Sequence, residues 1–583
     1  MMEIIKAKLT QLLRKTNIKG DINFSVPPKA DIGDLAFACF EEAKLLNQGS
    51  VLVAQNIASR INDDLQGESP LAKKDPVSAD IKEIIDKCQA VGSYLNFFIK
   101  PGYIAKVVIT KIKKDGKKYG INKNGKNQKV LLEYPSNNTH KELHVGHLRN
   151  ICIGNALTKV FTANGYKAVP INYVNDFGAH VAKCLWGLKK FHSKETSPKG
   201  GEQKWLGDIY AEASQYLAEH LDSKKEVEEL QKKLEAGDKS IQPLFLTTRK
   251  WSLDGFKKAF DELKVEHAKV FFEKDVKSAG QKMVDQLLKK KIAQVGEGGA
   301  IIVDLKQFNL DIGLLRKSSG TGLYLTSDLG LAVAKNKIFT KVSESVHITG
   351  TEQNFYFKQL FKILELAGYK YKMTHIGYGL VNRPEGKMSS RLGNVILYDE
   401  IRNEVYEQVF QETALRHPDW PKEKLIATAE KISFAAIKFD FLKHEAAKIM
   451  IFDAKSATSF DGFTGPYILY AAARINSILR KAGKGKGKID YSLLTQPAEK
   501  QTVILLGQFG EAIKKAYANY NPSVMAKYAF DLAQQYNDFY NQCSILKVEN
   551  EALQQARVGL SAVVKQTLEN CLDLLTIDTV EEM

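Results

Sequence analysis

Apolar residues between positions 129 and 400 occur in two alternating arrangements. Short β-prone runs are followed by longer segments whose apolar residues recur three and four positions apart, as between 153 and 161, which marks one face of a helix. The β-prone runs occupy residues 129–134, 168–174, 300–304, 345–349 and 373–380. Strands that alternate with crossover helices form a parallel, doubly wound sheet. The pattern therefore predicts an α/β unit over residues 119–400.

The chain has a different pattern on either side of this unit. Residues 1–118 form a first unit, and the lysine- and glycine-rich stretch at 113–128, which spans its boundary with the α/β unit, is expected to be a linker. Residues 401–583 are predicted to be helical. Within the α/β unit, residues 195–290 are too many for one crossover and are rich in lysine and glutamate, so we expect a mostly helical insertion. A chain of 583 residues is too long for one core, and three domains are predicted.

The first motif with chemical content follows the first predicted strand. His144-Val145-Gly146-His147 lies where that strand gives way to an amphipathic helix. Free backbone N–H groups and the helix dipole favour an anion at such a junction, and the two imidazoles add donors. Gly146 has no side chain, so a flat base or a ribose can approach the backbone. The alternatives are a metal site or simple capping, but the spacing and glutamate of a zinc hydrolase are missing and no third ligand lies nearby.

A second motif of the same kind lies near the end of the α/β unit. Lys387, Met388, Ser389 and Ser390 stand between Gly386 and Gly393, after a predicted strand. The ammonium group can neutralise charge on a leaving pyrophosphate, the hydroxyls can orient the loop, and the glycines allow it to close. A solvated basic surface loop is the alternative. Together the two motifs predict one ATP site, whose expected ligands are His144, Gly146, His147, Lys387, Met388, Ser389 and Ser390.

Composition narrows the class of protein further. The hydrophobic content of 44% is ordinary for a soluble globular protein, and the net charge of +17 suits a polyanionic partner. The six cysteines form no CxxC pair and no cluster with zinc spacing, so we expect reduced thiols, no protein-bound zinc and a cytoplasmic location. The sequence has no run of 18 apolar residues and its amphipathic N-terminus is not a secretory signal, so no membrane partner is expected.

The two motifs and their neighbours resemble those of class I aminoacyl-tRNA synthetases, and most closely those of arginyl-tRNA synthetases. Around the first motif the similarity extends over residues 133–149, Glu-Tyr-Pro-Ser-Asn-Asn-Thr-His-Lys-Glu-Leu-His-Val-Gly-His-Leu-Arg. The clear departure is Asn137, where the family usually has proline. The chain keeps Lys387, which many arginyl enzymes lack. Similarity covers nearly the whole chain through further segments, among them 27–34, 92–97, 205–210, 464–475 and 528–540.

The resemblance implies a fold and an activity. The fold would be a Rossmann-type, doubly wound catalytic domain with a helical insertion, an α+β N-terminal domain and an all-α C-terminal anticodon-binding bundle. The activity would be the ATP-dependent conversion of L-arginine to arginyl-adenylate and its transfer to the 3′-terminal adenosine of arginine tRNA. ATP would act with Mg²⁺, and the tRNA would touch the protein at its acceptor end, elbow and anticodon loop and be needed for activation. We expect a monomer that does not bind DNA.

The same resemblance implies the site residues. His144, His147, Lys387 and Lys141 would be catalytic. An arginine guanidinium needs a carboxylate in a shaped pocket. The implied arginine-binding residues are Glu133, Ser136, Asn137, Asn138, His147, Tyr324, Asp328 and Gln353.

Tyr324 and Asp328 share a face only if both lie on a helix, because four residues make about one helical turn. Residues 324–326 look like the end of a strand, so the helix is predicted to begin near Ser327, with Asp328 in its first turn. The alternative role for Asp328 is a helix cap or first-turn acid.

Three other functions share some of these features. A class I synthetase of another specificity is disfavoured by the Tyr324–Asp328 pair and the N-terminal unit. A non-catalytic RNA-binding relative would have lost the histidines or Lys387. A nucleotidyltransferase that shares the histidine motif would lack the helical C-terminal region. Exposed aromatic residues in that region would suit unstacked anticodon bases, although for any single tyrosine the core is the alternative.

Overall fold

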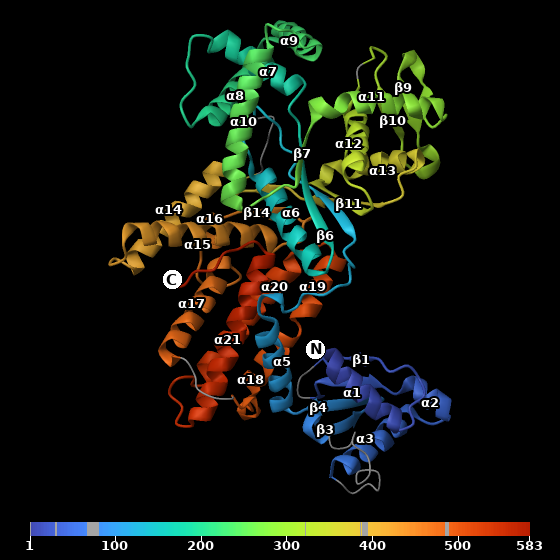
Figure 1. The fold of residues 1–583 in the computed structure, drawn as a ribbon, viewed down its shortest axis with the longest axis vertical. Coiled ribbons are helices and arrows are strands. Elements are labelled where there is room, and N and C mark those ends of the chain that lie inside the picture. Colours follow the sequence, from blue (N-terminus) through green and yellow to red (C-terminus); the bar gives the residue numbers. More distant parts are fainter. Residues whose placement is uncertain are drawn as a thin grey trace.

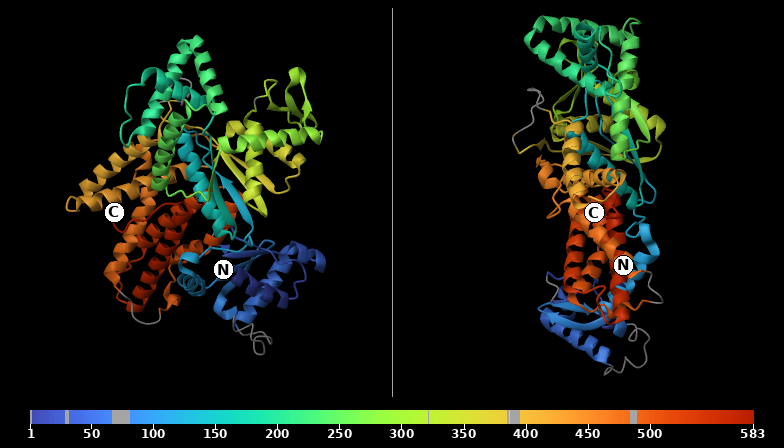
Figure 2. Two further views of the ribbon diagram at one scale, coloured as in Figure 1. Left: turned by 45° about the horizontal axis from the view of Figure 1, so that its top comes forward. Right: turned by 90° about the vertical axis from the view of Figure 1, so that its left-hand side faces the viewer.

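The computed structural model describes residues 2–28, 32–66, 81–320, 322–384, 386, 395–483 and 489–583. Lys387, Met388, Ser389 and Ser390, the second motif, lie outside the described residues. The molecule is elongated, with the helical insertion at one end and the N-terminal unit at the other (Figures 1 and 2). No helix in the described ranges has the length and apolarity needed to cross a bilayer.

A five-stranded parallel sheet lies at the centre, with strand order β12-β11-β5-β6-β7. Four of its strands were predicted close to their observed positions, which confirms the parallel α/β unit. The strands are β5 (Lys129–Glu133), β6 (Lys167–Val174), β7 (Lys269–Phe272), β11 (Val342–Gly350) and β12 (Lys372–Tyr378).

The prediction that residues 300–304 belong to this sheet is wrong. Strand β9 (Ile301–Asp304) pairs with β8 (Gln294–Val295) and β10 (Ile312–Arg316) in a separate antiparallel sheet. Its residues alternate between buried and more exposed, as expected for a sheet with one face in solvent. The central strand β5 is instead buried almost throughout. The remaining parallel strand is β7, inside the region expected to be helical.

Helices connect and cover these strands, and α6 runs along the middle of the molecule (Figure 1). It begins at Val145, directly after His144, and most of its residues are buried. The connecting helices are α6 (Val145–Ala163), α7 (Ala179–Phe191), α11 (Glu273–Lys289), α12 (Tyr324–Ile338) and α13 (Asn354–Ala367). The insertion adds α8 (Glu202–Glu219), α9 (Lys224–Ala236) and α10 (Gln242–Leu263).

The N-terminal unit packs helices on an antiparallel sheet of order β1-β2-β4-β3, as an α+β unit should. Its strands are β1 (Phe24–Ser25), β2 (Leu35–Ala38), β3 (Ile85–Val91) and β4 (Tyr94–Ile99). Its helices are α1 (Met2–Lys15), α2 (Phe40–Leu46) and α3 (Ser50–Gln66), followed by α5 (Pro101–Asp115).

The stretch 113–128 is not the free linker that its composition suggested. Tyr119 is buried, its ring stacks on Phe509 at 5.8 Å between centroids, and its hydroxyl donates to the carbonyl of Leu506 at 2.8 Å. The backbone N–H of Asn122 donates to the carbonyl of Ala163 at the end of α6. One buried aromatic residue therefore anchors a segment that is otherwise polar.

In its described residues, 401–483 and 489–583, the C-terminal region is helical, as predicted, apart from one two-residue strand. That strand, β14 (Met450–Ile451), pairs with β13 (Val381–Asn382) from the end of the α/β unit. The helices are α14 (Tyr398–Arg416), α15 (Lys422–Leu442), α16 (Ala454–Ala457), α17 (Gly465–Ala482), α18 (Pro497–Gly507), α19 (Phe509–Ala518), α20 (Ser523–Gln542) and α21 (Glu551–Leu574).

Candidate active site

The two histidines of the first motif form a compact pair at the start of α6. Their rings stack with centroids 3.8 Å apart. The backbone N–H of Gly146 donates to Nδ1 of His144 at 3.1 Å, and the backbone N–H of His144 donates to Nδ1 of His147 at 3.3 Å. Because each Nδ1 accepts a hydrogen bond, a neutral ring carries its proton on Nε2. The pair thus offers two Nε2–H donors.

Both imidazoles are neutral at physiological pH. Burial, followed by the charge of Lys141, lowers the pKa of His144 to about 4. Burial, His144 and Lys141 lower the pKa of His147 well below its usual value. The fixed positive charge beside the motif is therefore Lys141, whose Nζ lies 4.6 Å from the ring centroid of Tyr210 on α8. A phosphate near this pair would meet neutral donors and one cation.

Gly146 has a structural role that its sequence context did not reveal. A Cβ at this position would lie 2.9 Å from Cε1 and 3.0 Å from Nδ1 of His144. Carbon atoms do not approach so closely without displacement, so a side chain here would push the His144 ring out of its capping position. The absence of a side chain at Gly146 therefore leaves room for the His144 ring.

The segment that carries the second motif is held by hydrogen bonds at both ends. The first motif bonds one end, and Arg149 bonds the other. On its far side, the N–H of Val145 donates to the carbonyl of Ile396 at 2.9 Å, and the N–H of Tyr398 donates to the carbonyl of Leu143 at 2.9 Å. On its near side, the guanidinium of Arg149 donates to the carbonyl of Gly379 at 2.7 Å. Lys387 therefore belongs to a segment that begins beside Arg149 of α6 and ends beside the turn of His144 and His147.

Arg149 was overlooked in the sequence, although it ends the segment on which the resemblance was based. Its side chain is fully buried and also donates to the carbonyls of Leu380 and Glu445, both at 3.3 Å. Burial lowers its pKa to about 10, so it keeps its charge at neutral pH. The residues around Arg149 did not indicate that its side chain would hold the backbone of Gly379, far along the chain.

Three candidate arginine ligands lie in the turn after β5. Ser136 and Asn138 are partly exposed, whereas Asn137 is buried. The amide of Asn137 accepts a hydrogen bond from Asn172 at 3.0 Å, and its own Nδ2 has no hydrogen-bond partner among the described residues. Asn138 bridges to Asn175 just past β6. The turn thus joins the carboxyl ends of two adjacent parallel strands, where α/β sheets hold ligands.

The predicted start of α12 is wrong by one turn. The helix begins at Tyr324, where the hydroxyl of Thr326 accepts the N–H of Leu323 at 3.1 Å, so Asp328 lies in the second turn and is not a cap. Tyr324 and Asp328 share a helix face, but Tyr324 is 76% exposed and Asp328 is partly buried. Gln353 is exposed in a short turn after β11.

Asp328 faces a partly buried polar neighbour that the sequence did not single out. The hydroxyl of Tyr356 on α13 donates to its carboxylate. Burial raises the pKa of Asp328 to about 7, although the hydrogen bond from Tyr356 opposes the shift. A carboxyl group with this pKa is partly protonated near neutral pH. A permanent cation beside it would stabilise its ionised form.

Glu133, the second carboxylate expected to face arginine, already has a partner. It is 5% exposed and forms an ion pair with Lys335 of α12, and its other oxygen lies 3.5 Å from Nδ1 of His347 on β11. Burial alone would raise the pKa of Glu133, but the charge of Lys335 and hydrogen bonds from both neighbours lower it to about 2. Lys335 lies beyond the end of the recognisable motif, which is why its role was missed.

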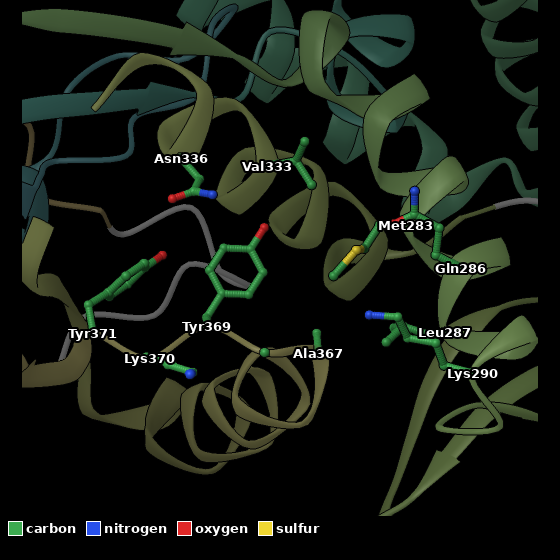
Figure 3. Close-up of a pocket in the computed structure, with 11 residues that line it drawn as sticks. Met283, Gln286, Leu287, Lys290, Val333, Asn336, Ala367, Tyr369, Lys370 and Tyr371 are labelled. Carbon is green, nitrogen blue, oxygen red and sulfur yellow. The ribbon is translucent and has the colours of Figure 1, made fainter. Parts of the chain in front are cut away.

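A cavity of about 370 Å³ lies at the other end of the sheet, where the chain enters β12 (Figure 3). Tyr369 stands between Asn336 and Met283 in this view, and the turn that carries it precedes the first residue of β12. None of the predicted site residues lines this cavity. Among the described residues, no group of three or more His, Cys, Asp or Glu side chains is placed to hold a metal ion.

Comparison with known proteins agrees with this geometry. Residues 108–454 match the family model for the catalytic domain of class I tRNA synthetases (R), and residues 468–583 match the DALR anticodon-binding domain. The chain therefore belongs to the class I aminoacyl-tRNA synthetases.

Full-length relatives define the branch within that class. The chain is 33% identical to the arginine–tRNA ligase of Clostridium botulinum strain Alaska E43, over 99% of this chain and 100% of that protein. It is 32% identical to that of Borrelia duttonii, over 100% of both. The Thermus thermophilus arginyl-tRNA synthetase structure superposes with a TM-score of 0.80 at 25% identity over 100% of both chains. This protein is a member of the arginyl-tRNA synthetase family.

Proposed function

We propose that this protein joins L-arginine to arginine tRNA at the expense of ATP. The observation that carries the proposal is the attachment of one end of the Lys387 segment to the turn of His144 and His147, and of the other end to Arg149 in the same helix. A carboxylate suited to a guanidinium, Asp328, lies on the helix that begins at Tyr324, beyond the carboxyl end of the same sheet. The nucleotide and the amino acid would then react at the carboxyl end of the parallel sheet.

ATP would lie against the start of α6. The Nε2–H groups of His144 and His147 would donate to phosphate oxygens, and Lys141 and Lys387 would supply positive charge as pyrophosphate leaves. Mg²⁺ would accompany ATP as part of the substrate. None of these groups needs to form a covalent bond, because the arginine carboxylate itself attacks the α-phosphate and catalysis consists of positioning and charge stabilisation. Met388, Ser389 and Ser390, which lie outside the described residues, would contribute to the same ATP site as Lys387.

Arginine would place its guanidinium at Asp328 and its backbone groups in the turn after β5. Asp328 accepts charge-assisted hydrogen bonds, and Tyr324 lies one helical turn before it. Ser136, Asn137, Asn138 and Gln353 would hold the remaining polar groups. The free Nδ2 of buried Asn137 supports this, since such a donor is costly without a partner.

The tRNA would span the long side of the molecule. Its acceptor end would reach the active site, its elbow the N-terminal unit and its anticodon loop the C-terminal helices. In α20, Tyr528 and Tyr536 are buried, whereas Tyr540 is 41% exposed and lies 5.1 Å from the guanidinium of Arg474. An exposed ring with an arginine beside it suits base stacking. The protein would act as a cytoplasmic monomer.

Charging of tRNA tests the proposal directly. The purified protein should attach labelled arginine to arginine tRNA in the presence of ATP and Mg²⁺, and should reject citrulline, which keeps the shape of arginine but lacks its charge. The His147→Ala variant serves as the inactive control. Charging with another amino acid but not with arginine would refute the proposal.

A further inference from the structure

An ion pair joins the N-terminal unit to the C-terminal helices, in a part of the chain that the proposed active site does not use. Nζ of Lys500 on α18 donates a hydrogen bond to Oδ2 of Asp34 at 2.9 Å. The side chains of Lys500 and Asp34 are 20% and 5% exposed, so solvent screens this pair less than a pair on the open surface. Figure 1 shows the N-terminal unit beside α5 and α18.

The residue before Asp34 explains how the carboxylate reaches its position. Gly33 has a φ of 137°, which favours glycine, and a Cβ there would lie 3.1 Å from Cβ of Asn96 on β4. The chain can therefore pass close to β4. The backbone N–H of Asp34 donates to the carbonyl of Phe97 at 2.8 Å, and its carboxylate accepts the N–H of Ile99 at 2.8 Å. Asp34 is thus fixed at the end of β4.

The N-terminal sheet is connected to the helices by one crossing of the chain. Strand β4 ends at Ile99, and α5 begins at Pro101. Beyond the crossing the packing is tight, because a Cβ on Gly102 would lie 2.7 Å from Cα of Ser492. A connection of one residue would let the sheet turn about Lys100 unless a further contact held it.

The other end of the ion pair is mounted on a fixed part of the bundle. Glu499, the neighbour of Lys500, is fully buried, and one of its oxygens accepts a hydrogen bond from Nε of Arg557 on α21 at 2.7 Å. Its other oxygen accepts the N–H of Gln496 at 2.8 Å, just before α18 begins. The first turn of α18, which carries Lys500, is therefore anchored to the core of the helices.

We propose that the ion pair of Asp34 and Lys500 fixes the angle between the N-terminal unit and the C-terminal helices, so that both contact one tRNA at once. The Asp34 carboxylate bonds to Ile99 on one side of the chain crossing and to Lys500 on the other. Two contacts with one ligand strengthen each other only when their spacing matches that ligand. Asp34 and Lys500 are then positioning residues. This inference rests on the proposed function, in which the tRNA elbow lies on the N-terminal unit and the anticodon loop on the helices.

The test compares Asp34→Asn with Lys500→Met. Asparagine can still accept the N–H of Ile99, so both variants lose mainly the contact between the two units. Each should raise the KM for arginine tRNA by about fivefold or more, while kcat and the KM values for arginine and ATP change by less than about twofold. The isolated anticodon stem-loop should bind as it does to the wild type, because it contacts the helices alone. The double variant should be no weaker than either single variant, since all three break one contact.

The matched control is Lys565→Met. The ion pair of Lys565 with Glu569 lies within α21, and the Lys565 side chain is 24% exposed, so this variant removes a similar charge without affecting the contact between the units. Its KM for arginine tRNA should stay within about twofold of the wild type. Lys500→Arg, which keeps the charge, should also bind tRNA as the wild type does.

Direct binding of RNA phosphate by Lys500 predicts the opposite sign for one variant. Asp34→Asn would then free Lys500 and lower the KM for arginine tRNA, and that result, or an unchanged KM in both variants, would overturn the inference. Thermal unfolding of each variant separates a lost contact from misfolding. If Asp34→Asn does not fold, Lys500→Met remains decisive, because an equal loss for the full tRNA and the stem-loop would contradict a positioning role. Absence of arginine charging by the wild type would instead refute the proposed function.

Discussion

The Asp328→Asn variant tests how the site recognises its substrate. Asparagine keeps the shape of the side chain and can still accept the hydrogen bond that the Tyr356 hydroxyl donates. It removes the negative charge that we propose for the guanidinium. The KM for arginine should therefore rise, while the KM for ATP, which depends on the turn of His144 and His147, should stay close to the wild-type value.

The size of the effect follows from the burial of the carboxylate. Removing one member of a buried, hydrogen-bonded charge pair costs about 3–5 kcal/mol. Because Asp328 is only partly buried, we expect the lower end of this range. At about 1.4 kcal/mol per factor of ten, the loss in kcat/KM for arginine is about 10²-fold.

The pH dependence gives an independent measure of the same group. Burial raises the pKa of Asp328 to about 7, and the ionised form is the one that accepts the guanidinium. The kcat/KM for arginine should thus increase as the pH rises through 7 and level off at higher pH, and this rising limb of the pH profile should be absent in Asp328→Asn. The raised pKa also means that ionisation of Asp328 destabilises the folded state as the pH rises from about 4 through 7. Asp328→Asn should therefore melt at a higher temperature than the wild type at pH 8, with the difference disappearing near pH 4.

The assay is steady-state charging of arginine tRNA between pH 5.5 and 8.5, with arginine or ATP varied in turn. Glu273 provides the matched control, because burial raises its pKa to about 7 as well, its carboxylate accepts a hydrogen bond from Ser327, and its charge makes only a minor contribution to the raised pKa of Asp328. Glu273→Gln should keep the pH limb for arginine. An unchanged KM for arginine in Asp328→Asn, or a limb that disappears in Glu273→Gln instead, would refute the reasoning.

Three further substitutions probe the supports of the site. Tyr356→Phe removes the hydrogen bond that opposes the raised pKa of Asp328, so the pH limb for arginine should move to higher pH while the KM for ATP stays constant. Gly146→Ala places a methyl group 2.9 Å from the His144 ring, and ATP binding, measured by calorimetry, should weaken by about tenfold or more without a comparable change in the KM for arginine. Arg149→Gln releases the carbonyl of Gly379, so kcat should fall by about tenfold or more, and a wild-type kcat would show that the Lys387 segment does not need this clamp.

Local sequence was sufficient where an element and its chemistry lie next to each other. The run before Glu133 and the histidine motif after it predicted a strand, a turn and a helix, and the structure has all three. The helical C-terminal region was also foreseen. These features depend on periodicity and on helix-terminus chemistry, both of which act over a few residues.

Sequence was not sufficient where the outcome depends on distant partners. Strand β7 is four residues long and acquires its identity only by pairing with β6, so it was assigned to a helical region. Residues 301–304 have the composition of a core strand but pair with a different sheet. Tyr119 anchors its polar stretch through Phe509, far away in the chain. The pairing of Glu133 with Lys335 joins β5 to the end of α12, and no local pattern records it.

Arginine-dependent exchange of pyrophosphate into ATP, measured with and without arginine tRNA, tests the central claim most directly. It reports the first chemical step, which requires the His144 turn, the Lys387 segment and the arginine pocket to work as one site. The account predicts exchange that requires arginine and appears when the tRNA is present. Binding of tRNA with no exchange under either condition would contradict it.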